Sequence, residues 1–502
     1  MARATGRRPL GPRLNSTWSL LAWMLVPLVA LTAIGPVDET DVYWHIKVGE
    51  DILANGRFGG DPSWTYGPAD AAWVTTQAAS EVLLYLVYWI GSWSGLVAFR
   101  IVLGGLVALS VLTALTRVVG RRPDLAVARA VALVATITAA SLVPYVQERP
   151  QTLSLLILPW IGLMSLRVMY ADRWPRWWVV GLVVLVWSWF HGAAVLVGPL
   201  LAGAALIHAL GSAGLKWLPV LIRSVRRGWL VVLVALVAPM LGPLGLGYYP
   251  QALKIQEAAS NRIVEWMAPD ANNGVFALAL TLIVIWTISV VRLAASSGRI
   301  WRTFRIDMLF LILMVIVMSQ AGRYLAVGAV LISPVVVRRL AQAWTRPSVR
   351  IERLGRRPAQ IILAVVWLAV LVITALSIAH ARPVARDRPL KIWTSLAEQP
   401  GERRAFVSYN LGGQAELLGE AVVNIDGRSD RYGGHRIDLI RDAVNGESNW
   451  EKVFNEYPGT TDVILGNGDQ LLGILKTRGW KVACTDAGFT WLTAPGVSGS
   501  CS

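Results

Sequence analysis

The chain has 502 residues, of which 55% are hydrophobic and only 16% are charged, and its mean hydropathy is +0.52. A soluble domain carries about 25% charged residues, so the composition excludes an ordinary soluble protein and predicts an α-helical polytopic membrane protein. The formal net charge of +16 does not indicate a nucleic-acid partner, because the basic residues recur between apolar runs, as positive-inside signals do.

About eleven apolar runs approach the length of ~20 residues that a bilayer crossing needs. They are 18–37, 95–116, 125–145, 151–170, 177–190, 193–211, 228–246, 274–292, 306–321, 324–340 and 360–379. The runs 177–190 and 306–321 are short, which tilted or broken helices would accommodate. The basic residues 1–17 leave a cleaved signal peptide as an alternative for the first run, but the many later runs favour a cytoplasmic tail followed by a span.

The charges of the linkers predict an orientation. If the N-terminus is cytoplasmic, every basic linker lies inside, in agreement with the positive-inside rule. We therefore expect a multi-pass plasma (inner) membrane protein. Acids, histidines and isolated arginines gather in the outer linkers instead: Glu39, Asp41, His45, Glu148, Arg149, His191, Glu257, Arg262, Glu265 and Arg323. This asymmetry predicts a site on the extracytoplasmic face.

The first outer loop, residues 38–94, begins with a cluster of ionisable residues beside the membrane. Such a cluster costs free energy unless it is solvated or paired, so it is a functional candidate. Asp38 is expected to cap a helix that ends before Gly56. On this helix Asp41 and His45 share one face, and an apolar stripe on another face predicts that the helix lies in the membrane interface.

Residues 380–502 have the composition of a soluble domain, which the orientation places outside. Alternating strands and helices predict a small α/β layer domain. The expected strands are 405–409, 421–425, 462–465, 480–484 and 489–493, and the expected helices are 413–418, 436–444, 450–457 and 470–477. Cys484 and Cys501 could form a disulfide in an oxidising compartment or remain two reduced thiols.

Motifs along nearly the whole chain resemble those of a large group of bacterial polytopic proteins related to the GT-C, protein mannosyltransferase-like, membrane glycosyltransferases. The matching segments are Glu39-x-Asp41-x-Tyr43-Trp44-His45, 61–66, Arg149-Pro150-Gln151, 187–192, Glu265-Trp266, Arg323 and 426–432. Glu39 departs from the aspartate that is common in the group, and Trp189 stands in place of asparagine. The resemblance implies a GT-C-like transmembrane domain over residues 18–379.

The resemblance also implies a chemistry. GT-C enzymes use a sugar on a polyprenyl phosphate, and the hydroxyl of a glycan, lipid or protein acceptor must lose a proton as it attacks. A carboxylate in a loop can accept that proton. We therefore expect Asp41 to be the general base and Glu39 to orient the acceptor or a metal; alternatively, both acids cap the following helix. No cofactor is certain, a divalent metal stays open, and the spacing of possible ligands identifies no metal site.

The remaining candidate residues would bind substrate. They are His45, Arg149, His191, Glu265, Trp266, Arg323, Asp426 and Arg428. The isolated arginines suit bidentate contacts with the leaving lipid phosphate, or else pair with Glu148 or Glu265. Each histidine either contacts the substrate or is a hydrogen-bonded structural residue.

The segment Asp426-Gly427-Arg428 has two interpretations. It follows an expected strand, where α/β domains commonly place binding loops, so it would bind the acceptor or close over the membrane site. Alternatively, it is a turn stabilised by pairing of Asp426 with Arg428.

We expect a membrane glycosyltransferase that moves a sugar from a polyprenyl-phosphate donor to an extracytoplasmic acceptor. A non-enzymatic transporter or flippase of lipid-linked glycans is the leading alternative and would not need Asp41 as a base. An inactive GT-C-like scaffold is another. Few charged residues fall in the middle of the spans, which favours the enzyme over the transporter.

Overall fold

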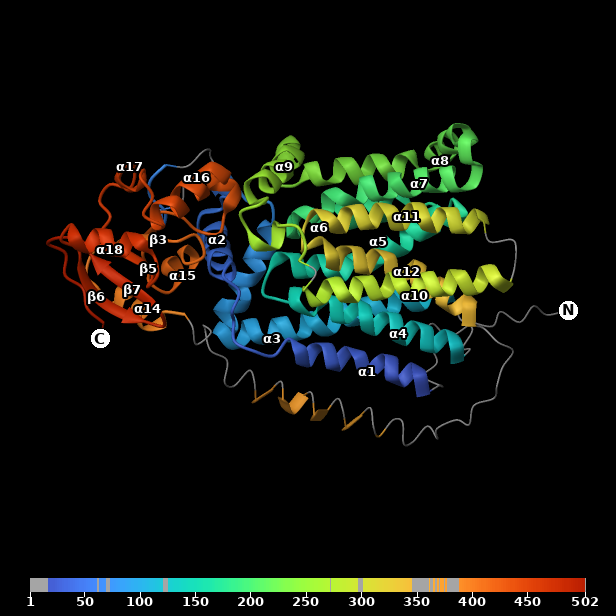
Figure 1. The fold of residues 1–502 in the computed structure, drawn as a ribbon, viewed down its shortest axis with the longest axis horizontal. Coiled ribbons are helices and arrows are strands. Elements are labelled where there is room, and N and C mark those ends of the chain that lie inside the picture. Colours follow the sequence, from blue (N-terminus) through green and yellow to red (C-terminus); the bar gives the residue numbers. More distant parts are fainter. Residues whose placement is uncertain are drawn as a thin grey trace.

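A computed structural model describes residues 17–60, 63–68, 73–120, 125–270, 272–296, 301–344 and 388–501, with scattered residues between 361 and 376. Residues 1–16 of the expected tail and much of the expected span 360–379 lie outside this description. The described chain forms a bundle of helices at one end and a mixed sheet with its own helices at the other (Figure 1). Helix α2 (Val42–Asn55) lies between these two parts.

Most helices of the bundle run side by side (Figure 1). They are α1 (Thr17–Thr32), α3 (Ala78–Val119), α4 (Leu125–Leu142), α5 (Pro150–Ala171), α6 (Trp177–Phe190), α7 (Val197–Ala213), α8 (Trp217–Val237), α10 (Gly274–Ser296), α11 (Trp301–Gln320) and α12 (Tyr324–Trp344). Short 3₁₀ turns connect or extend them: η1 (Val143–Tyr145), η2 (Gly192–Leu196), η3 (Gly214–Lys216), η4 (Ala238–Leu241) and η5 (Gly245–Gly247). Helices satisfy their own backbone hydrogen bonds, which is what an apolar segment requires in lipid.

Six helical segments within the described residues are long and apolar enough to cross a membrane. They are Ala78–Val119, Val127–Tyr145, Pro150–Ala171, Gly192–Leu241, Gly274–Ala295 and Tyr324–Trp344. The expected number of about eleven crossings is therefore too high by this measure. The expected runs 193–211 and 228–246 correspond to α7 and α8, two helices that pack against each other within the segment Gly192–Leu241. Helices α1 and α6 have only 16 and 14 residues.

Helix α3 is bent where it passes from the outer loop into the bundle. Ser92 has a positive φ of 49°, so the element consists of two helices joined at this residue. The bend separates the first part of α3 from the part that contains the expected span 95–116. Helices α5 and α12 are in contact at Gly162, where a Cβ would lie at an ordinary van der Waals distance of 3.4 Å from the ring of Pro334.

Helix α2 is packed on two sides by protein, and its position in the membrane interface stays a prediction. On one side a Cβ on Gly49 would lie 2.2 Å from the carbonyl oxygen of Glu81 in α3. On the other side a Cβ on Gly413 would lie 3.1 Å from the backbone nitrogen of Trp44. Val42 and Ile46 of the apolar stripe are buried by protein, whereas Leu53 is 52% exposed. The two glycine contacts fix α2 between the bundle and the sheet.

The sheet at the other end has five strands in the order β4-β3-β5-β7-β6. The strands are β3 (Arg404–Val407), β4 (Val422–Val423), β5 (Asp462–Gly466), β6 (Lys481–Asp486) and β7 (Phe489–Thr493), and the helices are α14 (Leu390–Ala397), α15 (Gly412–Leu417), α16 (Ser429–Val444), α17 (Trp450–Asn455) and α18 (Gln470–Thr477). β3 is parallel to β4 and β5, while β7 is antiparallel to β5 and β6. All nine expected elements are present, although α16 begins seven residues earlier than expected (436 − 429). Cys484 and Cys501 form a disulfide.

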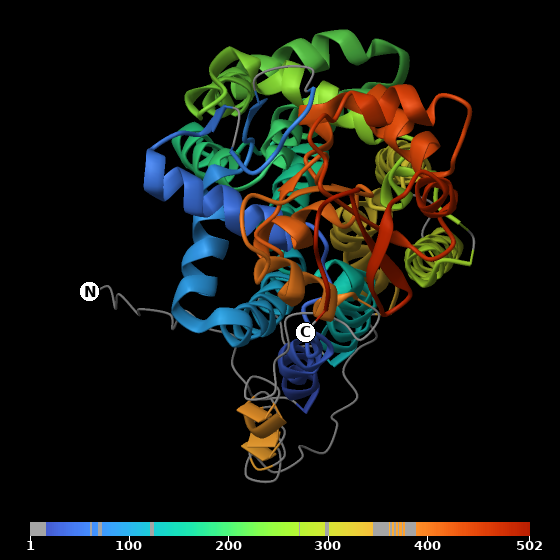
Figure 2. The same cartoon turned by 90° about the vertical axis from the view of Figure 1, so that its left-hand side faces the viewer.

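The first outer loop is attached to this sheet. It contains the two-residue strands β1 (Gly59–Gly60) and β2 (Trp73–Val74), which pair with each other. Residues between them extend the sheet at β4: Tyr66 N–H donates to Val423 at 2.9 Å, and Val423 N–H donates to Trp64 at 2.9 Å. Figure 2 shows the first loop (blue) beside the sheet elements (orange and red). Loop and sheet therefore hold their side chains in a fixed relation.

Candidate active site

A cavity of about 1320 Å³ lies where the bundle meets the outer elements. Its lining comes from the start of α2, the starts of α5 and α12, the segment after α9 (Tyr248–Ala259), and the turn before α16. The lining is charged near Asp41 and Arg149. It is apolar along the bundle, where Leu155, Leu158 and Val327 contribute. The cavity can thus take a polar group and an apolar chain at once, and its volume is above the range of about 300–1,000 Å³ that is usual for ligand sites.

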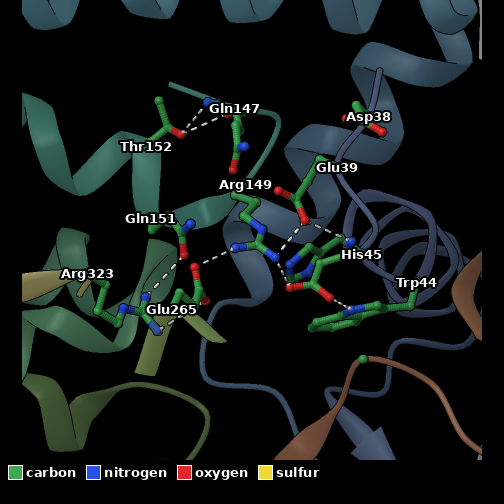
Figure 3. Close-up of polar contacts among 12 residues, drawn as sticks. Asp38, Glu39, Trp44, His45, Gln147, Arg149, Gln151, Thr152, Glu265 and Arg323 are labelled. Carbon is green, nitrogen blue, oxygen red and sulfur yellow. Dashed lines mark hydrogen bonds and ion pairs between the residues drawn. The ribbon is translucent and has the colours of Figure 1, made fainter. Parts of the chain in front are cut away.

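The guanidinium of Arg149 lies between three carboxylates (Figure 3). Its Nη2 is 2.6 Å from Glu39 Oε1 and 2.7 Å from Asp41 Oδ2. Its Nη1 is 3.1 Å from Glu265 Oε2. One arginine therefore joins acids from two separate loops. We call Glu39, Asp41, Arg149, Glu265 and Arg323 the open cluster.

The local sequence explains the position of Arg149. It precedes Pro150, which disfavours helical backbone in the residue before it, and its φ and ψ of −127° and 149° are extended. Arg149 is consequently the N-cap of α5 and projects from the helix start into the cavity. The suggested pairing with Glu148 is wrong, because the buried Glu148 pairs with Arg100 at 3.0 Å. The suggested pairing with Glu265 is confirmed.

Arg323 continues the open cluster toward the bundle. Its Nη1 is 3.6 Å from Glu265 Oε1, and its Nη2 donates to Gln151 Oε1 at 3.2 Å. The guanidinium carbon lies 4.3 Å from the centroid of the Trp266 ring, a cation–π contact. Arg323 N–H also donates to the carbonyl of Glu265 at 3.0 Å. The Glu-Trp segment and the late arginine, which the sequence treats as separate motifs, form one unit.

Asp41 occupies the N-cap of α2 but does not use its carboxylate as a cap. The residue expected in that position, Asp38, lies outside the helix. Asp41 Oδ1 accepts a hydrogen bond from Trp44 Nε1 at 3.2 Å, and Oδ2 binds Arg149. Gly427 lies against the same atoms, since a Cβ there would lie 2.5 Å from Asp41 Oδ1. The capping interpretation of Asp41 is therefore wrong, and its carboxylate is part of the cavity wall.

Burial raises the pKa of both acids of the first loop. Desolvation raises the pKa of Asp41, while Arg149 and the Trp44 hydrogen bond oppose the rise. Its side chain is 26% exposed, but toward the cavity, so the surrounding protein still excludes most bulk water. Burial, with a contribution from the neighbouring Asp41, raises the pKa of Glu39 to about 7. A raised pKa makes the carboxylate form of such a residue a stronger base in proton transfer.

His191 is held as a neutral donor. Its Nδ1 accepts the backbone N–H of Ala193 at 3.3 Å and lies 2.8 Å from Ser154 Oγ. Ser154 Oγ in turn accepts from Trp187 Nε1 at 2.8 Å. Nδ1 must therefore be unprotonated, which leaves the proton on Nε2. Burial, together with the nearby Arg323, lowers the pKa of His191 to about 3, and the residue lines the cavity.

The Nδ1 atom of His45 points away from the open cluster. Its Nδ1 lies 3.4 Å from Glu81 Oε1 and 3.5 Å from Gln77 Nε2. The ring lies 3.6 Å from the ring of Trp44, centroid to centroid. Burial lowers the pKa of His45, so the ring is neutral. His45 lines the cavity by one edge while supporting Trp44, which holds Asp41.

Asp426 and Arg428 form the buried ion pair that the turn interpretation predicts. Arg428 Nε donates to both carboxylate oxygens at 2.9 and 3.0 Å, and Tyr432 donates to Asp426 at 3.0 Å. Burial acts to raise the pKa of Asp426, but Arg428 and its hydrogen bonds lower it below the ordinary value. The pair fixes the turn that presses Gly427 onto Asp41. Arg428 also lines the cavity, so a direct substrate contact stays a prediction.

Two groups escape the sequence analysis. Tyr409 donates to the carbonyl of Gly427 at 2.7 Å. Asp430 accepts hydrogen bonds from Trp73 Nε1 at 3.0 Å and from Gln251 Nε2 at 2.6 Å. Asp430 follows the Asp-Gly-Arg segment by two residues and could have been found there. The partners of Asp430 are far away in the sequence, so no local sequence pattern predicts these contacts.

The arrangement does not fit a divalent metal among the carboxylates. A hard cation would have to take the carboxylate oxygens as ligands, and the guanidinium of Arg149 already binds three of them. Among the described residues, no group of three or more His, Cys, Asp and Glu side chains is placed to hold a metal ion.

No family model and no curated protein matches the chain. Solved structures do. Archaeal oligosaccharyltransferase AglB from Archaeoglobus fulgidus, in complex with an inhibitory peptide and a dolichol-phosphate, is 13% identical with a TM-score of 0.51 over 90% of this chain and 69% of that chain. Its apo form is 12% identical with a TM-score of 0.52 over 91% and 70%. The form tethered to an acceptor peptide is 12% identical with a TM-score of 0.50 over 90% and 69%.

At these identities the likeness shows the fold. The chain has the fold of this oligosaccharyltransferase, a GT-C glycosyltransferase. The resemblance that the motifs indicate is thereby confirmed at the level of architecture: a membrane bundle, a structured first outer loop and a C-terminal part with a small mixed sheet.

Proposed function

We propose that this protein is a membrane glycosyltransferase that moves a sugar from a polyprenyl-phosphate donor to an acceptor on the extracytoplasmic side, with Asp41 as general base. The observation that carries the proposal is the setting of Asp41. Its carboxylate is fixed by Arg149, Trp44 and Gly427 on the wall of a large cavity. The complex of the archaeal enzyme with a dolichol-phosphate supports a donor of the same kind here.

The donor would lie along the cavity. Its polyprenyl chain suits the apolar lining on the bundle side, for example Leu155 and Leu158. Its phosphate suits two hydrogen-bond donors: Arg323, which belongs to the open cluster, and the Nε2–H of His191. Both residues line the cavity. A guanidinium and an imidazole N–H are the kinds of group that stabilise charge on a leaving phosphate.

The reaction balances with the residues present. The acceptor hydroxyl gives its proton to Asp41 while its oxygen bonds to the anomeric carbon. The bond from that carbon to the phosphate oxygen breaks, and polyprenyl phosphate leaves with the electron pair toward Arg323. Glu39 shares Arg149 with Asp41 and so positions the base. The acceptor, whether glycan, lipid or protein, would approach Asp41 from the cavity that this residue lines.

The orientation is part of the proposal. The open cluster is built from the linkers that the positive-inside rule places outside, and the sheet is attached to the same end (Figure 1). The protein is then a multi-pass plasma membrane protein with a cytoplasmic N-terminus and an extracytoplasmic C-terminal domain over residues 380–502.

The test is transfer of a labelled sugar from a polyprenyl-phosphate donor by the purified full chain. Asp41→Asn should lower the rate by about 10²–10⁴-fold, the usual contribution of a general base. Asp38→Asn is the matched control, because Asp38 is 63% exposed and pairs only loosely with Arg388 at 3.5 Å. Full transfer by the Asp41 variant would refute the assignment of the base.

A further inference from the structure

The contacts of Arg149 resemble those of a bound cation more than those of an ordinary ion pair. An arginine usually binds one carboxylate with its two terminal nitrogens. Arg149 instead spreads Nη1 and Nη2 over three carboxylates, at 2.6, 2.7 and 3.1 Å. The three oxygens converge on the guanidinium from two loops, as ligands converge on a metal ion.

The guanidinium is held in this position. The side chain is 13% exposed, and it projects from the first turn of α5, where Pro150 sets the backbone. Withdrawal would leave three carboxylates facing one another in a largely enclosed site, and such like charges repel strongly there. The guanidinium of Arg149, which the acids hold in place, therefore excludes any second cation from the same space.

We propose that Arg149 takes the place of a divalent cation in this site, so that the open cluster is assembled and works without a bound metal. The proposal rests on the proposed function only in taking Asp41 as the base. Arg149 is a positioning residue: it holds Glu39, Asp41 and Glu265 together and does not itself react.

A single positive charge suits the role of Asp41. A divalent ion bound to a carboxylate disfavours its protonation more strongly than one delocalised guanidinium does. Burial outweighs Arg149 here, and the pKa of Asp41 stays above its ordinary value. The carboxylate can therefore be assembled with its neighbours and still accept a proton from a hydroxyl acceptor, which supports the proposal.

The experiment uses the full chain in detergent, treated with EDTA, desalted and titrated with Mn²⁺ as the probe. Wild type should retain no stoichiometric Mn²⁺, and its transfer activity should be the same with and without EDTA. Arg149→Ala should bind about one Mn²⁺ per chain, at least about 100-fold more tightly than wild type, because a repulsive charge at contact distance is gone and three oxygens are freed. Addition of Asp41→Asn and Glu39→Gln to that variant should abolish the gain.

Arg323→Ala is the matched control, since it removes one contact of Glu265 but leaves all three carboxylates on Arg149, and it should not gain Mn²⁺ binding. Stoichiometric Mn²⁺ on wild type, or transfer that EDTA abolishes and Mn²⁺ restores, would overturn the proposal, and this arm needs no variant to fold. A folded Arg149→Ala chain that gains no Mn²⁺ would overturn it as well. Mn²⁺ binding is measured without substrate, so a failure of the proposed transfer function would not be mistaken for a failure here.

Discussion

Two ion clusters in this molecule show how charge is used for different purposes. The open cluster lines the cavity. The second, which we call the closed cluster, consists of Asp307, Arg339, Trp286 and Tyr170 inside the bundle. Asp307 lies near the start of α11 and the open cluster lies beyond its end, roughly 20 Å away along the helix axis.

The closed cluster is balanced. Asp307 accepts from Arg339 Nε at 2.5 Å, from Arg339 Nη2 at 2.9 Å and from Trp286 at 3.0 Å, with Tyr170 as a further donor. One acid meets one base, and Asp307 is fully buried. In the open cluster three acids meet two arginines, and all line or adjoin the cavity. The difference indicates a structural role for the closed cluster, and the surplus of acid in the open cluster agrees with the proposed role of Asp41 as a base.

Asp307→Asn should give the largest stability effect. The substitution leaves Arg339 buried without its counter-ion, and breaking a buried pair in this way costs about 3–5 kcal/mol. We expect a lowered melting temperature in detergent. The transfer activity of the molecules that remain folded should stay near that of wild type. A variant as stable as wild type would mean that the closed cluster is not what holds these helices.

Glu39→Gln should change how stability depends on pH. The pKa of Glu39 is about 7 in the folded chain and 4.5 ordinarily. Between these values the folded chain holds a proton that the unfolded chain has lost, so this group destabilises the wild type as pH rises from 4.5 to 7, by at most about 3 kcal/mol. The melting temperature of Glu39→Gln minus that of wild type should therefore increase across this window.

The control for this pH experiment is Glu50→Gln, because Glu50 is 44% exposed and pairs with Lys47 on the surface. Its difference from wild type should stay constant with pH. A constant difference for Glu39→Gln as well would contradict the raised pKa and, with it, the view that the open cluster carries unbalanced acid.

Arg323→Gln should give the smallest effect. Loss of one charge-assisted contact to a phosphate is worth about 1.5–3 kcal/mol, so retention of polyprenyl phosphate should weaken by roughly 10–100-fold. Quantification of the lipid that co-purifies would measure it. Arg227→Gln, a change at an arginine that is 59% exposed and pairs with Asp172, is the control. Equal retention by both variants would remove Arg323 from the phosphate site.

The sequence predicts the parts of this fold well where the pattern is local. The five strands and four helices after residue 400 follow from period and turn residues, and all are present. Among the described residues fewer helices than expected are long and apolar enough to cross a membrane, because an apolar run alone does not distinguish a span from a short helix such as α6. The packing of α2 between α3 and α15 depends on Gly49 and Gly413, which no amphipathic pattern reveals.

The sequence predicts which residues form the candidate site better than it predicts which of them contact one another. The acids and arginines of the outer linkers indicate the cavity lining in part: Asp41, Arg149, Arg262, Glu265 and Arg323 line it, whereas Glu39, Glu148 and Glu257 do not. The partners of Arg149 could not be predicted from its sequence neighbours. The adjacent Glu148 pairs with Arg100, and the three acids that bind Arg149 lie 108 to 116 residues away. Gly427 against Asp41 is a contact across most of the chain, and only the fold brings it about.

The most direct test of the account is mass spectrometry of the lipids that co-purify with the gently extracted protein, with wild type, Asp41→Asn and Asp38→Asn compared. If Asp41 is the base of a transfer reaction, a polyprenyl-phosphate sugar should accumulate on Asp41→Asn above the level on the other two. Equal enrichment on all three would instead indicate transport or simple binding, as expected of a flippase. Absence of polyprenyl lipid from all three would contradict the proposed donor.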